Sequence, residues 1–221
     1  FVIAFLWVGL GLLFCLRPVS AGIVRDSDEV SLPIPDGDLA GTLVRIHVSD
    51  VPVGQGIRDL NVSLSVDGTV GFNGDLFAYL TKTDNSGFSI LMNRVGREPN
   101  NQFGSAGSGL KNLVFDDEAA DGDIHFYETV IGESSIFGLP WTGTWQPDGR
   151  LVDPALITGA EPRGALLDQF DGIDPNGEWL LFLADVSPGG LLTLTDWSLE
   201  FELDADVSTF SGVASDGLVA G

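Results

Sequence analysis

Apolar and polar side chains alternate with a period of two residues in several stretches of the chain. The clearest are residues 44–49, 60–67 and 196–203, in which Val44, Leu60 and Trp197 begin the apolar series. This alternation predicts strands that bury one face and expose the other, as in a two-layer antiparallel sandwich. We therefore predict an all-β protein folded as an antiparallel two-sheet β-sandwich.

Two further stretches, residues 76–80 and 179–184, are apolar at every position. We predict that they form central strands covered on both sides, either by the second sheet or by loops. The segments 104–109 and 121–172 are rich in Gly, Pro, Asp and Trp, which favours long loops and short edge strands. No amphipathic helix of useful length is evident after the first residues.

The beginning of the chain predicts export. Residues 1–16 are apolar, and Val19-Ser20-Ala21 offers small residues before Gly22, as at the cleavage site of a secretory signal peptide. The run is shorter than the ~20 residues that usually span a membrane. We predict a signal peptide over 1–21, a linker over 22–33, one domain over 34–203 and a polar tail over 204–221. The product is then secreted or at the cell surface, with no stable membrane span after cleavage and with the tail leading to a surface anchor.

Charge and cysteine content narrow the range of partners. The chain has 32 acidic and 10 basic residues, a formal charge of −22, which disfavours nucleic acid and favours divalent cations or basic partners. The alternative explanation of this negative charge is that it keeps the protein soluble. The single cysteine, Cys15, lies in the predicted signal, so the exported chain has neither disulfides nor a cysteine–zinc site.

A set of short motifs resembles the P domain, also called the Homo B domain, of subtilisin-like proprotein convertases. Phe115–Ala119 matches an acidic F-D-D-x-A signature, Asn176–Trp179 an N-G-x-W strand and Trp197–Phe201 a terminal W-S-L-x-F strand. The other segments that carry the resemblance are Ile34–Asp36, Asp59–Leu64, Gly74–Leu76 and Trp141–Gly149. The resemblance covers residues 34–203 and implies a jelly-roll sandwich.

The sequence departs from that family at three points. Thr83–Gly87 replaces the usual turn after the G-D-L strand, residues 148–167 form a longer segment, and the subtilisin-like catalytic domain is absent. His47 and His125 are the only histidines, and we predict that both face solvent without a nucleophile nearby. We therefore predict that this chain is not an enzyme.

Clustered carboxylates are typical of calcium sites, and the resemblance to a family in which some members are associated with calcium adds to this hypothesis. The predicted ligands are Asp75, Asp116, Asp117, Glu118 and Asp185. The alternative is that Asp116 and Asp117 cap turns by accepting hydrogen bonds from backbone N–H groups.

The loop with Trp141 and Trp145 predicts either an exposed ligand-binding platform or a plug at the end of the sandwich.

The features of the sequence, taken together, are compatible with two functions. The first is a secreted, non-catalytic accessory module, calcium-stabilised, that binds a protein or a glycan. The second is the regulatory or stabilising part of a subtilisin-like serine endopeptidase, with the catalytic domain outside this chain.

Overall fold

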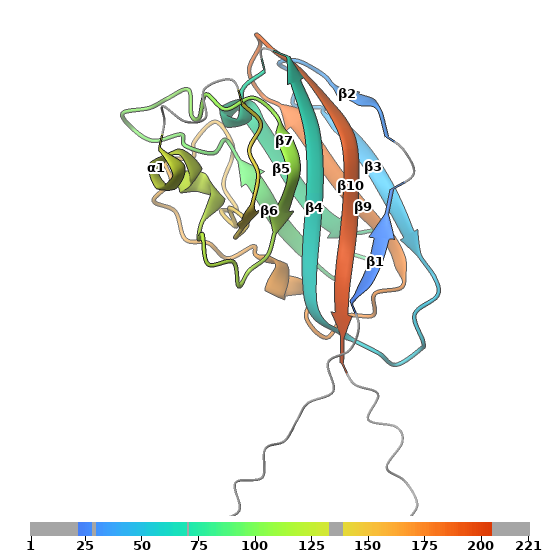
Figure 1. The fold of residues 1–221 in the computed structure, drawn as a ribbon. Coiled ribbons are helices and arrows are strands. Elements are labelled where there is room, and N and C mark those ends of the chain that lie inside the picture. Colours follow the sequence, from blue (N-terminus) through green and yellow to red (C-terminus); the bar gives the residue numbers. More distant parts are fainter. Residues whose placement is uncertain (1–21, 28–29, 70, 133–138, 205–221) are drawn as a thin grey trace, which may run out of the picture.

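The structure, a computed structural model, describes residues 22–27, 30–69, 71–132 and 139–204. Two β-sheets pack against each other as layers of a sandwich (Figure 1). The predicted two-sheet β-sandwich is therefore confirmed. The predicted signal peptide lies outside the described residues, as does the tail from residue 205 onward.

The larger sheet is built around two long strands, β4 and β10, of 13 residues each. Its strand order is β1-β10-β4-β7-β8, and β2 also pairs with β10. All of these pairings are antiparallel except that of β7 with β8. The strands are β1 (Ile23–Asp26), β2 (Leu32–Ile34), β4 (Ile57–Thr69), β7 (Leu110–Phe115), β8 (Thr144–Trp145) and β10 (Leu191–Leu203).

The smaller sheet has the order β3-β9-β5-β6, and every pair in it is antiparallel. Its strands are β3 (Thr42–Val48), β5 (Leu76–Lys82), β6 (Phe88–Asn93) and β9 (Gly177–Asp185). The two stretches without alternation became β5 and β9, and both are central strands, as predicted.

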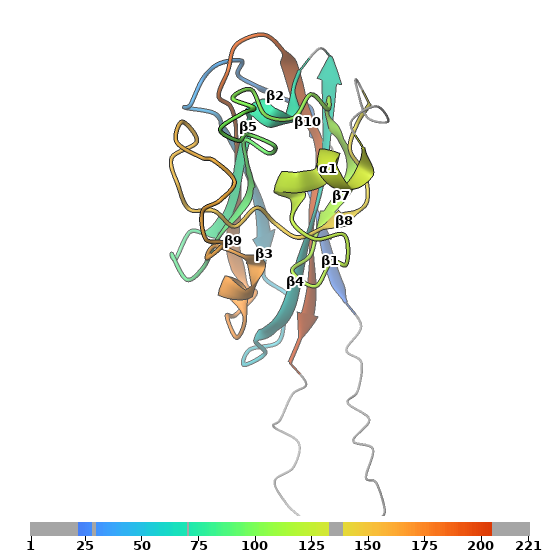
Figure 2. The ribbon, with the colours of Figure 1, turned by 90° about the vertical axis from the view of Figure 1, so that its left-hand side faces the viewer.

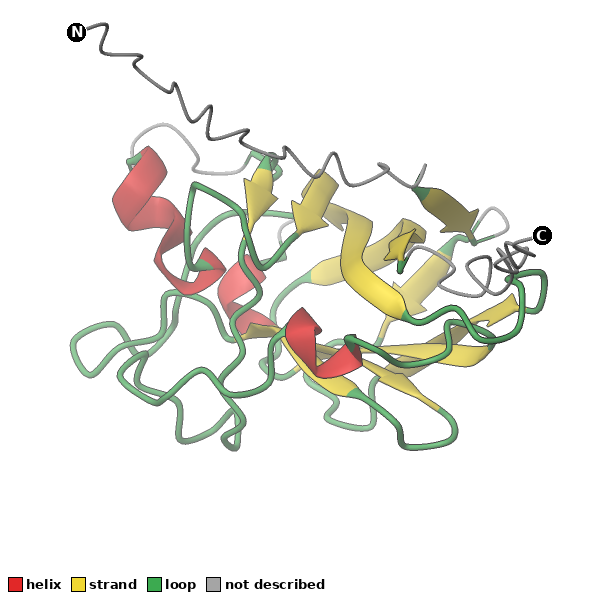
Figure 3. Ribbon diagram, turned by 90° about the horizontal axis from the view of Figure 1, so that it is seen from below, coloured by secondary structure: helices red, strands yellow, loops and turns green. Residues whose placement is uncertain are grey.

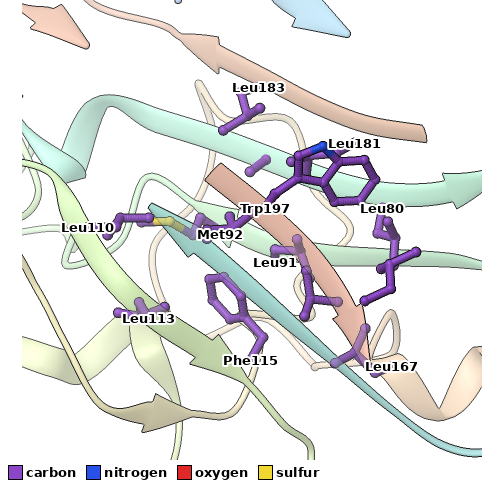
Figure 4. Packing of buried hydrophobic residues seen from close by; sticks show 14 of the residues in the cluster. Leu80, Leu91, Met92, Leu110, Leu113, Phe115, Leu167, Leu181, Leu183 and Trp197 are labelled. Carbon is purple, nitrogen blue, oxygen red and sulfur yellow. The ribbon is translucent and has the colours of Figure 1, made fainter. Parts of the chain in front are cut away.

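The core lies between the sheets and follows the alternation in the sequence. Leu60, Val62, Leu64 and Val66 of β4 are at most 1% exposed, while Asn61 and Ser63 between them are only partly buried. Trp179 of β9 and Trp197 of β10 are fully buried. Side chains from both sheets meet in this core (Figure 4), among them Leu80, Leu91, Met92, Leu113, Phe115 and Trp197.

Helical segments are short and lie in the loops, which gather mainly on one side of the strands (Figure 3). They are η1 (Asn73–Asp75), η2 (Ile124–Phe126), α1 (Tyr127–Ile131) and η4 (Leu167–Phe170). Within the described ranges no helix is long and apolar enough to cross a membrane.

The linker prediction for residues 22–33 is wrong. β1 pairs with β10 over four residues, from Ile23 opposite Phe201 to Asp26 opposite Ser198, and β2 pairs with β10 farther along. Without these two short strands, one edge of β10 would present unpaired backbone groups to solvent. The N-terminal segment is therefore part of the domain and completes the larger sheet.

Candidate functional site

The five predicted metal ligands lie in two different sheets. Asp75 precedes β5 and Asp185 ends β9, so the two carboxylates are close together at one end of the smaller sheet. Asp75 Oδ1 lies 3.4 Å from Nη2 of Arg94, and Asp185 Oδ1 accepts a 3.2 Å hydrogen bond from the N–H of Ser187. Burial raises the pKa of both carboxyls, that of Asp185 to about 6.

Asp116, Asp117 and Glu118 follow β7 in the other sheet. Asp116 Oδ1 accepts a 2.8 Å hydrogen bond from the N–H of Glu118. The carboxylate of Asp117 accepts hydrogen bonds from the N–H groups of Leu167 and Asp168, at 3.2 and 2.7 Å, and so caps η4. This geometry matches the turn-capping alternative for both aspartates.

Glu118 faces a shallow depression on the outer side of the larger sheet. The depression is lined by Arg58, Asp59, Asn61, Asp116, Glu118 and Glu202. Burial raises the pKa of Glu118 to about 7, and the charges of Asp59 and Asp116 add to the rise. Among the described residues no group of three or more His, Cys, Asp or Glu is placed to hold a metal ion. The five predicted ligands do not form one site, and calcium binding stays a prediction.

Trp141 and Trp145 do not form an exposed platform. Their side chains are 0% and 1% exposed, and the ring of Trp141 stacks on Tyr127 of α1 at 4.1 Å. Trp145 Nε1 donates to the carbonyl of Thr142. The prediction of a ligand-binding platform there is contradicted, because Tyr127 of α1 packs against both indoles and both belong to the core.

The two histidines differ in environment. His47 lies on the exposed side of β3, as predicted. The prediction for His125 is wrong: its side chain is buried, with Nδ1 2.7 Å from Oδ2 of Asp148 and Nε2 3.1 Å from the carbonyl oxygen of Arg97. Both ring nitrogens are therefore occupied, and His125 is not free to act as a general base.

The side chain of Arg150 extends the network around His125. Its Nη1 lies 3.3 Å from Asp148, and its Nη2 lies 2.7 Å from Asp123. Arg150 Nε also donates to the carbonyl oxygen of Gly159. These contacts tie the long loop after β8 to the segment that precedes α1.

An aromatic cluster to which the sequence pattern assigned no role occupies the outer face of the smaller sheet. Tyr79 of β5 lies directly opposite Phe182 of β9, with the rings stacked at 4.8 Å and 17°. The ring centroid of Phe88 in β6 lies 5.1 Å from that of Tyr79. Phe77 contacts both Tyr79 and Phe182. We call Phe77, Tyr79, Phe88 and Phe182 the aromatic face.

Leucines from two loops border the aromatic face and remain largely exposed. Leu39 is 67% exposed and Leu151 is 72% exposed, and both line one pocket with Phe77, Tyr79, Val152, Asp153, Pro154 and Phe182. The loop that carries Leu151 follows β8 and runs beside the smaller sheet (Figure 2).

Gly41 allows the other loop to pass close to the sheet. Its φ is 57°, and a Cβ there would lie 2.5 Å from the ring of Phe182. Only glycine combines this backbone conformation with such a close approach at low cost.

The sequence carried a signal for this surface. Residues 76–80 and 179–184 are apolar at every position, which predicts cover on both sides. The inward residues of β5 and β9 are indeed buried, but Phe77, Tyr79 and Phe182 on the outward side are only partly buried. The outer face is an apolar surface that the described part of the chain covers incompletely.

Comparisons with known proteins show only distant structural similarity. No protein-family model matches the chain, and no curated protein matches it. Two similar solved structures are the serine protease of Aeromonas sobria and the complex of that protease with its chaperone, at TM-scores of 0.44 and 0.45. Both are 15% identical, and each alignment covers 86% of this chain and 28% of the other chain. At this level of similarity neither structure bears on the function of this chain.

Proposed function

We propose that the domain is a non-catalytic accessory module that binds a macromolecular partner through the aromatic face. The observation that carries this proposal is the concentration of partly exposed apolar side chains on one side of the smaller sheet. Tyr79 and Phe182 form its centre, and Leu39, Leu43 and Leu151 surround them with exposed fractions of 38% to 72%. Contiguous apolar surface of this kind is typical of interaction sites, because water contact with it is unfavourable.

The position of these residues in the fold supports the proposal. Leu43, Phe182 and Tyr79 lie in register across three adjacent strands, so their side chains project from the same face of the sheet. Strands with regular backbone pairing hold these positions rigidly. A rigid surface loses little conformational entropy when a partner binds.

The surroundings of the two histidines agree with a non-catalytic role. His125 is enclosed by Asp148 and the backbone of Arg97, and His47 is on the exposed side of an edge strand. Neither arrangement resembles a base that is oriented toward a nucleophile.

A relationship to the P domain is part of this proposal, supported by the positions of the motifs. The segment Asp59–Leu64 lies within β4, Asn176–Leu181 leads into β9 and Trp197–Phe201 lies within β10. These are core strands of both sheets. An accessory role beside a serine endopeptidase remains the alternative within the same class of function.

Export is a further part of the proposal, and mass spectrometry tests it. Secreted protein that begins at Gly22 is the expected result, because the apolar run and Val19-Ser20-Ala21 favour cleavage after Ala21. Secreted protein that retains residues 1–21, or retention of the whole product in the cytoplasm, would contradict it.

The binding proposal is tested with a labelled domain on two arrays, one of random peptides and one of glycans. The wild-type domain is expected to bind members of one array, and Tyr79→Thr is expected to abolish this binding. Threonine suits a strand, so the substitution removes the ring without opposing the local backbone conformation.

Val24→Thr is the matched control, because Val24 is 47% exposed on β1 of the other sheet. This variant should bind as the wild type does. The proposal fails if neither array is bound, or if Tyr79→Thr binds as well as Val24→Thr.

A further inference from the structure

We infer that the partner at the aromatic face is a protein segment that combines aliphatic and basic side chains. This inference rests on the proposed function and specifies the chemistry of the ligand. Three observations carry it: the way the rings pack against one another, the aliphatic border of the site and the sign of the charge around it.

The ring packing disfavours a glycan. Sugars bind aromatic side chains by laying their C–H groups against an open ring face. Tyr79 is the central ring, and Phe182 and Phe88 lie on its two sides, at centroid distances of 4.8 and 5.1 Å. These neighbours come from the strands on either side of β5: the ring of Phe182 stacks on Tyr79 at 17°, and the ring of Phe88 is tilted by 36°. The central ring therefore offers a sugar less open face than an isolated ring would.

The border of the site fits aliphatic side chains. Leu39 and Leu151 extend from two loops, and Val152 and Pro154 complete the same pocket. Methyl groups and ring edges together form a non-directional apolar surface. Burying an apolar side chain of a partner against such a surface lowers the free energy of binding, in proportion to the area shielded from water.

Charge selects between a second copy of the chain and a different partner. Among the described residues that line the pocket, Asp153 is the charged one, and the exposed Asp38 is adjacent in sequence to Leu39. The exposed Arg45, on the same side of β3 as Leu43, is paired with Glu178 at 3.9 Å. The whole chain carries a formal charge of −22. Two copies that met through this face would bring like charges together and repel each other. Lysine or arginine side chains around an apolar centre would instead be attracted.

The experiment uses three fluorescent peptides of about 12 residues, long enough to cross the sheet when extended at about 3.3 Å per residue. In the first peptide Leu alternates with Lys, in the second Leu alternates with Glu, and in the third Ser alternates with Lys. Binding is measured by fluorescence anisotropy at about 150 mM salt, where long-range charge effects are largely screened. The Leu/Lys peptide is expected to bind most tightly, because only it satisfies both requirements.

Two sets of variants locate the binding. Leu39→Ser with Leu151→Ser removes the aliphatic border at positions that are mostly exposed, so the fold should be retained. This double variant is expected to raise the Kd for the Leu/Lys peptide about tenfold or more. Asp38→Asn with Asp153→Asn keeps the local hydrogen bonds to Ala40 and Ala155 but removes two charges, and is expected to weaken only the preference for Lys over Glu.

Each other outcome overturns the inference. Equal binding of the Leu/Lys and Ser/Lys peptides would mean attraction by net charge alone. Glycan binding that depends on Tyr79 would leave the proposed function intact and refute the peptide ligand. Sedimentation that shows a dimer of the wild type, lost in Tyr79→Thr, would assign the face to a second copy. Absence of any ligand for the face would instead refute the proposed function itself.

Discussion

The imidazole Nδ1 of His125 lies 2.7 Å from Oδ2 of Asp148, and both side chains are fully buried. The two residues belong to segments on either side of β8, so this contact joins η2 to the long loop that leads to η4. That loop also carries Leu151, which borders the aromatic face. The buried pair therefore holds part of the candidate binding surface in place.

His125→Ala should lower the free energy of unfolding by about 3 kcal/mol, because it leaves a buried carboxylate oxygen without a donor and opens a cavity. Urea denaturation measures the change. His47→Ala is the control, since this exposed side chain should change stability by less than about 0.5 kcal/mol. Equal effects of the two substitutions would contradict the structural role of His125.

Asp117→Ala should lower the free energy of unfolding by about 0.5–2 kcal/mol, the range for loss of a helix cap. The reason is that its carboxylate accepts the N–H groups of Leu167 and Asp168. Thermal melting with a chelator present measures the loss in the absence of divalent ions. Asp67→Asn, an exposed change on β4, serves as the control. A loss that appears only when calcium is added would show that Asp117 acts as a ligand instead.

Calcium is predicted to raise the melting temperature through the depression that contains Asp116 and Glu118. A cation there would relieve the repulsion among Asp59, Asp116 and Glu118, and binding only to the folded state adds about 2.7 kcal/mol at a hundredfold excess over Kd.

Magnesium should act less strongly, because it requires tighter octahedral coordination. Sodium chloride at matched ionic strength separates this effect from general screening. Asp116→Asn should weaken the calcium shift, and Asp67→Asn should not. Equal shifts with all three salts would refute a specific site.

Stability should fall as the pH rises from about 4 to about 7. The folded state raises the pKa of Glu118 to about 7 and that of Asp185 to about 6, above their ordinary values of 4.5 and 3.8. The folded protein therefore binds these protons more tightly than the unfolded chain does. Their stabilising contribution is complete below the ordinary pKa values and is lost progressively as the pH rises through the folded-state values of about 6 and about 7.

Melting temperatures across this pH range measure the effect. Glu118→Gln, which resembles the protonated side chain, should reduce the fall, whereas Glu178→Gln on the exposed side of β9 should leave it unchanged. A melting temperature that increases with pH would contradict the assignment.

Several features of the fold could be predicted from local sequence. Val62 and Leu64 are buried on one face of β4, and Trp197 of β10 is buried in the core. Alternation determines these positions, because successive side chains of a strand point to opposite faces. The same periodicity could not show that Ile23–Asp26 joins β10, since a strand of four residues has too few positions to establish a pattern.

The candidate site depended on contacts between residues far apart in the chain. Asp117 caps a segment about fifty positions away, and His125 is buried because Asp148 and Arg97 enclose it. Local residue types showed that these groups were polar but not which partners they would meet. For the same reason, the five predicted calcium ligands were separated between the two sheets.

Apolar residues at every position of β5 and β9 were enough to predict two strands that are apolar on both faces and central in their sheet. The packing of the two layers made the second sheet cover one face and left the other face, with Tyr79 and Phe182, partly open. Tertiary contacts likewise placed Tyr127 of α1 against Trp141, which the sequence left as either platform or core. The physical reason is that apolar character is a property of each residue, whereas burial depends on which distant segment packs against it.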